Sequence, residues 1–260
     1  MGRVIAVANQ KGGVGKTTTA VNLSASMALG GSHVLLVDMD PQAHATSGIG
    51  VAKGAVGVSV YDVIINGLSM ASALVPTAIK GLDLAPGSIH LAGAEVELAS
   101  LQSREFRLRE SMRPVRDWYD MLFVDCPPSL GLLTVNALAA ADELLIPIQC
   151  EYYALEGLAQ LTESVNLVRR RLNPGLRIGG VLLTMFDART NLSEQVAAEV
   201  RRHFAEEVYQ TVIPRSVRLA EAPSFGQPVV TYDPSSKGAE AYVALAREVS
   251  ARAGQPAVAD

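Results

Sequence analysis

A glycine-rich segment near the N-terminus has the residue types that bind phosphate. Residues 11–18 read Lys-Gly-Gly-Val-Gly-Lys-Thr-Thr and stand between an apolar run of strand length and a stretch of helical period. That strand–loop–helix setting is the one that a phosphate-binding P-loop requires. Glycines let backbone N–H groups turn inward around phosphate oxygens, and the following helix adds its positive N-terminal end. The segment therefore predicts a site for nucleotide phosphates.

The side chains of this segment have distinct expected roles. Lys16 is placed to reach the β- and γ-phosphates, and the Thr17 hydroxyl to ligate Mg²⁺. The general P-loop pattern has a glycine where this chain has Gln10, and a second lysine, Lys11, precedes the glycine pair. The alternative is a glycine-rich turn with two solvated lysines. The residues expected to hold the nucleotide are Lys11, Gly12, Gly13, Val14, Gly15, Lys16, Thr17 and Thr18.

Two carboxylates follow the next apolar run. Asp38 ends that run, and Asp40 comes two residues later, before a proline and a glutamine. Parallel sheets bind ligands at the carboxyl ends of their strands, so we expect both carboxylates to face the γ-phosphate. Asp38 is nearer the strand and is expected to orient Mg²⁺-bound water or the loop. The alternative is that they only cap a turn or a helix.

A third site is predicted where the apolar run 121–125 ends in Asp125. Four apolar residues followed by aspartate match a Walker B strand, whose carboxylate holds Mg²⁺, usually through water. Alone, this pattern is a weak signal for a Walker B strand. It becomes a strong one because it follows the other two predicted sites in the expected order along the chain. Pro127, Pro128 and Gly131 then predict a switch II segment that senses the γ-phosphate.

The elements that must position these residues alternate along the chain. Strands are predicted at 4–8, 33–38, 82–85, 121–125, 143–148 and 178–184, and most of them are continuous apolar runs, which are typical of strands buried on both faces of a parallel sheet. Helical periods occur at 17–29, 104–117, 132–141, 155–172, 193–207 and 236–252. Repeated βα units predict an α/β fold, with a doubly wound, mostly parallel sheet and helices on both faces. We expect one domain over 1–252 and a disordered tail over 253–260.

Composition narrows the class of protein. The chain has 260 residues, of which 49% are hydrophobic and 18% charged, so a disordered or fibrous chain is excluded. No apolar run is long enough to span a membrane, and the start of the chain lacks a signal peptide, so a cytoplasmic protein is expected. The formal net charge is −4. Any DNA binding must therefore come from a local patch, which a dimer would enlarge.

The double-lysine P-loop resembles the deviant Walker A motif of the group that contains ParA, MinD and the nitrogenase iron protein. Two further segments, 149–157 and 212–223, are similar to Soj-type chromosomal ParA proteins, and the resemblance runs across nearly the whole chain. It implies a Mg²⁺-dependent ATPase, slow alone and stimulated by a partner, that segregates chromosomes or plasmids. The guanine-reading Asn-Lys-x-Asp pattern is absent, which favours ATP.

The resemblance also implies residue roles. Lys11 would reach across an ATP-sandwich homodimer to the partner's phosphates, and Asp40 would position or polarise the attacking water. Arg189 and Arg218 would contact double-stranded DNA without sequence preference, and Met185 and Pro214 would contact the base. A ParB/Spo0J-type centromere-binding protein would stimulate hydrolysis and release the dimer from DNA. The protein would thus act at the nucleoid.

Competing classes share parts of this pattern. A MinD-like membrane-associated positioning ATPase is the main alternative, but it needs a C-terminal amphipathic helix that residues 251–260 do not supply. An iron–sulfur reductase would need paired cysteines between two subunits, and the placement of Cys126 and Cys150 does not match that pattern. A purely structural nucleotide-binding scaffold would lack the catalytic aspartate. The expected partners therefore include no membrane.

Overall fold

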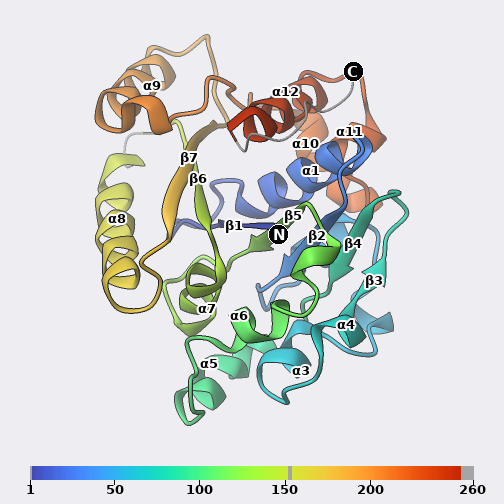
Figure 1. Cartoon of the computed structure of the whole chain (residues 1–260). Coiled ribbons are helices and arrows are strands. Elements are labelled where there is room, and N and C mark those ends of the chain that lie inside the picture. The colour runs from blue at the N-terminus through green and yellow to red at the C-terminus, as the bar shows by residue number, and fades with distance from the viewer. Residues whose placement is uncertain (1, 152–153, 253–260) are drawn as a thin grey trace.

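A seven-stranded sheet forms the centre of the computed structural model, which describes residues 2–151 and 154–252 (Figure 1). The strand order is β3-β4-β2-β5-β1-β6-β7, and every neighbouring pair is parallel except β3 with β4. The strands are β1 (Arg3–Val7), β2 (Val34–Asp38), β3 (Val75–Pro76), β4 (Leu82–Ala85), β5 (Met121–Asp125), β6 (Glu143–Gln149) and β7 (Arg177–Thr184). The predicted doubly wound, mostly parallel sheet is confirmed.

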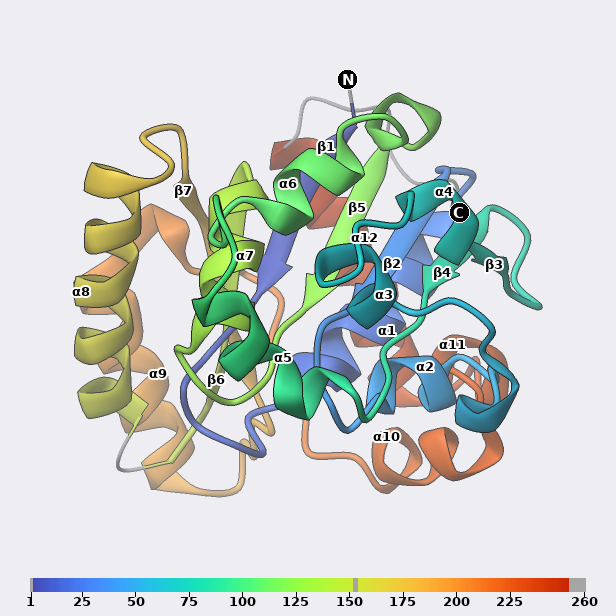
Figure 2. The same ribbon diagram turned by 90° about the horizontal axis from the view of Figure 1, so that it is seen from below.

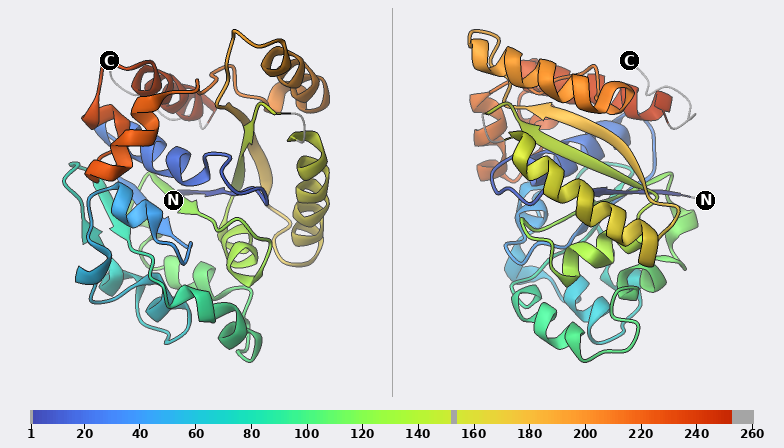
Figure 3. Two further views of the ribbon diagram at one scale, coloured as in Figure 1. Left: turned by 180° about the vertical axis from the view of Figure 1, so that it is seen from behind. Right: turned by 90° about the vertical axis from the view of Figure 1, so that its left-hand side faces the viewer.

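Helices cover both faces of this sheet (Figures 1 and 3). The longer ones are α1 (Lys16–Leu29), α5 (Leu91–Ala99), α6 (Arg107–Met112), α7 (Leu132–Ala140), α8 (Ala154–Arg171), α9 (Asn191–Phe204) and α12 (Lys237–Arg252). The shorter ones are α2 (His44–Gly48), α3 (Val60–Ile64), α4 (Met70–Ala73), α10 (Val217–Glu221) and α11 (Val229–Tyr232). No helix of the described residues is both long and apolar enough to cross a membrane.

The central strand β1 shows how the two faces are divided. Val4 and Ala6 belong to one buried cluster, which includes apolar residues of α5, α6, α7, α8 and α9. Ile5 and Val7 belong to a second cluster on the other face, with α1 and α12. Successive side chains of a strand point to opposite faces, so a strand buried between two helical layers must be apolar throughout.

The helix predicted over 104–117 is wrong in its length. Only α6 (Arg107–Met112) is helical there, followed by a 3-10 turn at Arg116–Trp118. Pro114 lies between them. Proline lacks an N–H and its ring clashes with the carbonyl four residues earlier, so the helical period ends at that point. The predicted tail 253–260 and residues 152–153 of the family-like segment lie outside the described residues.

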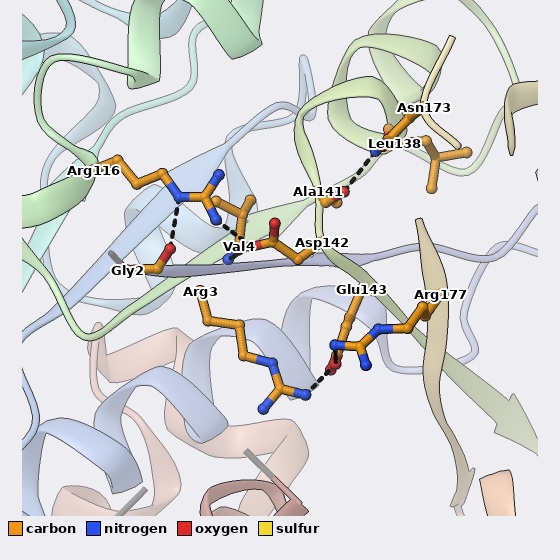
Figure 4. Close-up of polar contacts among 10 residues, drawn as sticks. All are labelled: Gly2, Arg3, Val4, Arg116, Leu138, Ala141, Asp142, Glu143, Asn173 and Arg177. Carbon is orange, nitrogen blue, oxygen red and sulfur yellow. Dashed lines mark hydrogen bonds and ion pairs between the residues drawn. The ribbon is translucent and has the colours of Figure 1, made fainter. Parts of the chain in front are cut away.

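The amino ends of three adjacent strands are tied together by ion pairs, at the end of the sheet opposite the P-loop (Figure 4). The buried Glu143 of β6 accepts from Arg3 of β1 and, at 2.9 Å, from Arg177 of β7. Its neighbour Asp142 accepts from the Val4 backbone N–H at 2.7 Å. These contacts fix the order β1-β6-β7 by side-chain chemistry as well as by the backbone ladder.

We predict that Glu143→Ala lowers the free energy of unfolding by about 2–3 kcal/mol, because it leaves two arginines without their shared carboxylate. This loss is smaller than the usual cost of about 3–5 kcal/mol for removing one partner of a buried ion pair, because the Arg177 side chain is 68% exposed and can turn to water. Urea denaturation measures this. An exposed glutamate of α8, Glu163, is the matched control, and its alanine variant should stay within about 0.5 kcal/mol of the wild type. Equal midpoints for both variants would contradict the prediction.

Candidate nucleotide site

The P-loop is the connection between β1 and α1. Gly13 and Gly15 have φ angles of 76° and 88°, a left-handed region that side chains rarely adopt. Gly15 precedes α1 directly, and its carbonyl accepts from the Thr19 N–H at 2.8 Å. The Thr184 hydroxyl, at the end of β7, donates to the Val14 carbonyl at 2.9 Å. The loop is therefore shaped by its glycines and braced by a distant strand.

Lys16 points into the loop. It is only 6% exposed, and its Nζ donates to the Lys11 carbonyl at 3.0 Å. Burial lowers its pKa, while the negative charges of Asp125 and Asp40 oppose that shift. Two of the three predicted site carboxylates, Asp125 and Asp40, are thus close enough to act on the loop lysine. Such a buried cation is suited to pair with phosphate oxygens.

Lys11 points away from the loop, although its backbone belongs to it. Its N–H donates to Asn9 Oδ1 at 3.0 Å, and its Nζ lies 3.4 Å from Glu151 Oε2, just beyond the end of β6. The Lys11 side chain is 38% exposed and that of Glu151 46%. The two lysines of one loop therefore face different surroundings, Lys16 the buried interior of the loop and Lys11 the solvent side.

Asp125 presents a buried carboxylate that makes no hydrogen bond to the described residues through either oxygen. Burial raises its pKa well above the ordinary value, as does the charge of Asp38, its partner in the sheet register. The nearby Thr17 hydroxyl and Lys16 ammonium act in the opposite direction. Two unpartnered oxygens beside a threonine hydroxyl are hard ligands, and they fit a Mg²⁺ site.

Asp38 has a different environment, because its oxygens are already bonded. Oδ2 accepts from the Thr46 N–H at 2.8 Å and from the Thr46 hydroxyl at 2.7 Å, and Oδ1 accepts from the Asp40 N–H at 3.2 Å. Burial raises the pKa of Asp38 to about 6, although the Thr46 bonds oppose the shift. Of its two predicted roles, orientation of the loop has direct contacts to support it.

Asp40 lies on the loop that these bonds hold. It is 7% exposed, and its Oδ1 accepts from the Gln42 N–H at 2.8 Å. Its carbonyl accepts from the Ala43 N–H at 2.8 Å, which closes a tight turn before α2. Asp40 therefore does cap a turn, which was the alternative to a role at the γ-phosphate.

One cavity is lined by both residues that were expected to contact the base of the nucleotide. Met185 and Pro214 lie with Gly15 and Thr18 around a volume of about 240 Å³, walled on one side by Tyr242 of α12. Met185 has a φ of 50°, a left-handed conformation that is uncommon outside glycine and marks functional sites. The cavity opens beside the P-loop, as a base attached to bound phosphates requires.

The two arginines that were expected to contact DNA lie on neighbouring segments. Arg189, on the loop between β7 and α9, is 86% exposed and forms a two-pronged pair with Asp187 at 2.8 and 2.9 Å. This pairing lowers the pKa of Asp187 to about 2. Arg218, in α10, contacts Glu221 at 2.9 Å and Asp233 at 3.0 Å.

Several polar residues of the site escaped the sequence analysis. They are Asn9, which caps the Lys11 N–H; Thr46, which bonds Asp38; Glu151, which pairs with Lys11; Thr184, which bonds the P-loop; and Tyr242, which lines the cavity. A signal existed for part of this set. Polar residues at the carboxyl ends of parallel strands are candidates for the site whatever their motif.

The arrangement defines a class of protein. The strand ends β1, β2 and β5 meet at one edge of the sheet and carry the loop, the two carboxylates and Asp125 (Figure 2). Together with the cavity beside the loop, this is the nucleotide site of a P-loop protein. A family model described as an AAA domain matches residues 2–178, which agrees with that class.

Relatives define the family more narrowly. The sporulation initiation inhibitor protein Soj of Bacillus subtilis is 56% identical over 251 residues, which cover 96% of this chain and 99% of that protein. The chromosome partitioning protein ParA of Myxococcus xanthus is 53% identical over 252 residues, covering 97% and 89%. The chain belongs to the Soj/ParA family of chromosome-partitioning ATPases.

A solved structure agrees in fold over the whole chain. Cobyrinic acid a,c-diamide synthase from Mycobacterium smegmatis, with bound ADP and magnesium, superposes with a TM-score of 0.85 at 36% identity and full coverage of both chains. Its identity to this chain is lower than that of the partitioning proteins. The shared element is therefore the nucleotide-binding fold.

We predict that Asp125→Asn stabilises the nucleotide-free protein by about 0.5–2 kcal/mol while weakening Mg²⁺-dependent ATP binding. The raised pKa values of Asp125 and Asp38 mean that the folded state keeps these protons to higher pH than the unfolded chain. The contribution of Asp38 to stability is therefore lost as pH rises from about 4 through about 6, and that of Asp125 is lost as pH rises well above the ordinary pKa of an aspartate.

The gain should consequently be larger at about pH 8 than at about pH 5, as measured by urea denaturation without nucleotide or Mg²⁺. Asp120→Asn, a change of equal charge at the opposite end of β5, is the control. A variant that is less stable than the wild type at both pH values would show that the Asp125 carboxylate is satisfied in the fold.

Proposed function

We propose that this chain is a Mg²⁺-dependent ATPase that forms an ATP-sandwich homodimer, binds double-stranded DNA without sequence preference, and segregates chromosomes or plasmids with a ParB/Spo0J-type partner. The proposal of a dimer rests mainly on one observation, namely that the two lysines of the P-loop point in different directions. Lys16 points into its own phosphate site, whereas the Lys11 ammonium lies outside it, beside Glu151. An exposed lysine on the rim can reach a second subunit's phosphates.

The contact that holds Lys11 in its own subunit is weak enough to exchange. Both side chains of the Lys11–Glu151 pair are more than one third exposed, at 3.4 Å. Exposed pairs of this kind contribute about 0–1 kcal/mol. A triphosphate carries several charges and accepts from lysine more strongly than one carboxylate does. Binding of ATP in a partner subunit would therefore compete successfully for Lys11.

Within one subunit, the P-loop backbone and Lys16 would hold the phosphates, with the base in the cavity of Met185 and Pro214. Thr17 and Asp125 would hold Mg²⁺, with Asp38 acting through water or through the loop that it orients. Bound Mg²⁺ neutralises charge on the phosphates during transfer. Asp125 would then gain the cationic partner that the fold alone does not provide.

Hydrolysis would depend on Asp40. A water oxygen attacks the γ-phosphorus, the bond from that phosphorus to the bridging oxygen breaks, and ADP and inorganic phosphate result. Asp40 would orient the water or accept its proton, while Lys16 stabilises the charge that develops on the phosphoryl oxygens. The bond from the Gln42 N–H leaves one Asp40 oxygen for this role.

We predict that Asp40→Ala binds ATP and dimerises but loses hydrolysis by roughly 10²–10⁴-fold. The lost group acts on the water, while the P-loop contacts to ATP remain. Single-turnover hydrolysis and light scattering with ATP measure the two properties. Asp38→Ala is the comparison, since it removes the loop anchor. If Asp40→Ala stays monomeric with ATP, Asp40 is structural and Asp38 becomes the better catalytic candidate.

DNA binding would use Arg189 and Arg218 after dimerisation. The chain has a net charge of −4, so a single subunit presents few free positive charges. Both arginines are already paired with carboxylates, but these surface pairs are weak and DNA phosphates can replace them. A dimer would place two sets of arginines on one surface and add avidity.

The base cavity gives a physical route from nucleotide to this surface. The Phe186 N–H donates to the Ile213 carbonyl at 3.0 Å, and the Arg215 N–H donates to the Phe186 carbonyl at 3.1 Å. These bonds join the loop of Arg189 to the segment that leads into α10. Met185 and Pro214, from the same two segments, line the cavity. Nucleotide binding would therefore order both arginine-bearing segments together.

We predict that Arg189→Ala and Arg218→Ala each weaken DNA binding about equally on unrelated duplexes. Each change removes two phosphate contacts per dimer, so the slope of log K against log salt should fall by about two. Anisotropy titrations at several salt concentrations, with a non-hydrolysable ATP analogue, measure this. Arg113→Ala is the control, because it removes the same charge from an exposed site beyond α6.

Unchanged affinity in both variants, or tight binding by the nucleotide-free monomer, would place the DNA surface elsewhere. Arg169, Arg170 and Arg171, at the end of α8, would then be tested next. ATP hydrolysis without DNA should be unaffected by either substitution, because both arginines lie outside the phosphate site. That result separates a DNA defect from a nucleotide defect.

A further inference from the structure

The C-terminal helix α12 contacts both the cavity proposed for the base and the chain that leads into that cavity. Tyr242 lines the cavity, and its buried hydroxyl lies 3.1 Å from the Thr19 hydroxyl of α1, the helix that follows the P-loop. Further along the same helix, Glu248 contacts the segment 207–211, which leads to Pro214. One helix thus connects two parts of the base site.

Two consecutive backbone N–H groups of this segment donate to the Glu248 carboxylate. The Gln210 nitrogen lies 2.8 Å from Oε1, and the Thr211 nitrogen lies 3.0 Å from Oε2. The Glu248 side chain is only 18% exposed. Hydrogen bonds to an ionised acceptor are roughly twice as strong as those between neutral groups. The carboxylate therefore fixes the backbone at a point just before the chain reaches the cavity.

Arg252 keeps the Glu248 carboxylate in place. Its guanidinium donates to Glu248 Oε1 at 3.0 Å and to the Val208 carbonyl at 3.0 Å. The guanidinium also lies over the Tyr209 ring, 4.3 Å from the ring centroid. Glu248 is thus bonded by two backbone N–H groups and one guanidinium, and Arg252 binds the same segment that Glu248 binds.

The held segment passes directly into the wall of the cavity. One residue separates Thr211 from Ile213, and Ile213 and Pro214 both line the cavity. The Ile213 N–H donates to the Leu183 carbonyl of β7 at 2.8 Å. The wall is therefore fixed on one side by the sheet and on the other by Glu248, so a shift at Thr211 would move it.

We propose that Glu248 is a positioning residue for the base of the nucleotide. By bonding residues 210–211, it holds the wall of Ile213 and Pro214 in the conformation that receives a base. Glu248 lies outside the residues that line the cavity and acts through the backbone of 210–214. A wall that is ordered in advance spares the ligand the free-energy cost of ordering it. The inference rests on the proposed base site, since its effect is on binding of the base.

Isothermal titration calorimetry with Mg·ADP and with Mg·pyrophosphate separates the base from the phosphates. Both ligands use the P-loop, but only ADP brings a base, and neither depends on hydrolysis. We expect Glu248→Ala to weaken ADP binding by about 5- to 20-fold and pyrophosphate binding by less than about twofold, because the receptive wall is populated for a smaller fraction of the time. Glu248→Gln keeps one acceptor oxygen, so its loss should be smaller.

A matched control lies on the same helix. Glu240 is exposed in the first turn of α12, so Glu240→Ala should bind both ligands like the wild type. Steady-state hydrolysis gives a second readout, in which Glu248→Ala should raise KM for ATP and leave kcat nearly unchanged. Equal losses of ADP and pyrophosphate binding would overturn the proposal, because Glu248 would then act on the whole fold. A Glu248→Ala variant that binds ADP like the wild type would overturn it as well.

Hydrogen exchange without nucleotide tests the positioning itself. Amides of residues 210–213 should exchange faster in Glu248→Ala than in Glu240→Ala, and equal exchange in the two variants would contradict the role of Glu248. The wild type provides the test of the base site on which this role rests. A wild type that binds ADP no more tightly than pyrophosphate would contradict the proposed base site, and with it this inference. A wild type that prefers ADP, beside a Glu248→Ala variant with the same preference, would contradict the inference alone.

Discussion

The unpartnered carboxylate of Asp125 is the constraint around which the rest of the site is arranged. It is buried at the end of β5, beside Asp38 in register on β2, and Lys16 acts on it from the P-loop. Burying a charge without a partner is costly, so the fold tolerates it only with compensation nearby. A bound cation and phosphates would complete the charge balance, which makes ligand binding part of the site's electrostatics.

The neighbouring groups keep this arrangement open to ligand. The Asp38 carboxylate is held by hydrogen bonds from Thr46, so it does not rotate away from the Asp125 carboxylate. The Lys16 ammonium donates a hydrogen bond to the Lys11 carbonyl instead of forming a full ion pair with a carboxylate. Stability is thus given up at the positions that a nucleotide would contact, as active sites commonly do.

The sequence predicted most of the sheet and the phosphate motifs, because both depend on local pattern. Strands 82–85 and 121–125 have the predicted bounds, since short, mostly apolar runs flanked by glycine, proline or aspartate mark buried strands. The helices α2 to α5 were missed, because tertiary and capping contacts hold them, such as the Ser59–Asp62 capping box of α3. Glu151 was missed for a related reason, since 140 residues separate it from Lys11.

The claim that two subunits complete one another's sites is tested most directly by sedimentation velocity with ATP, with ADP and without nucleotide, each with and without DNA. We expect a monomer without nucleotide or with ADP, a dimer with ATP, and a DNA complex only in the ATP samples. Lys11→Ala should bind labelled ATP yet remain a monomer. A dimer that forms equally in all three nucleotide conditions, or a Lys11→Ala variant that dimerises with ATP like the wild type, would contradict the account.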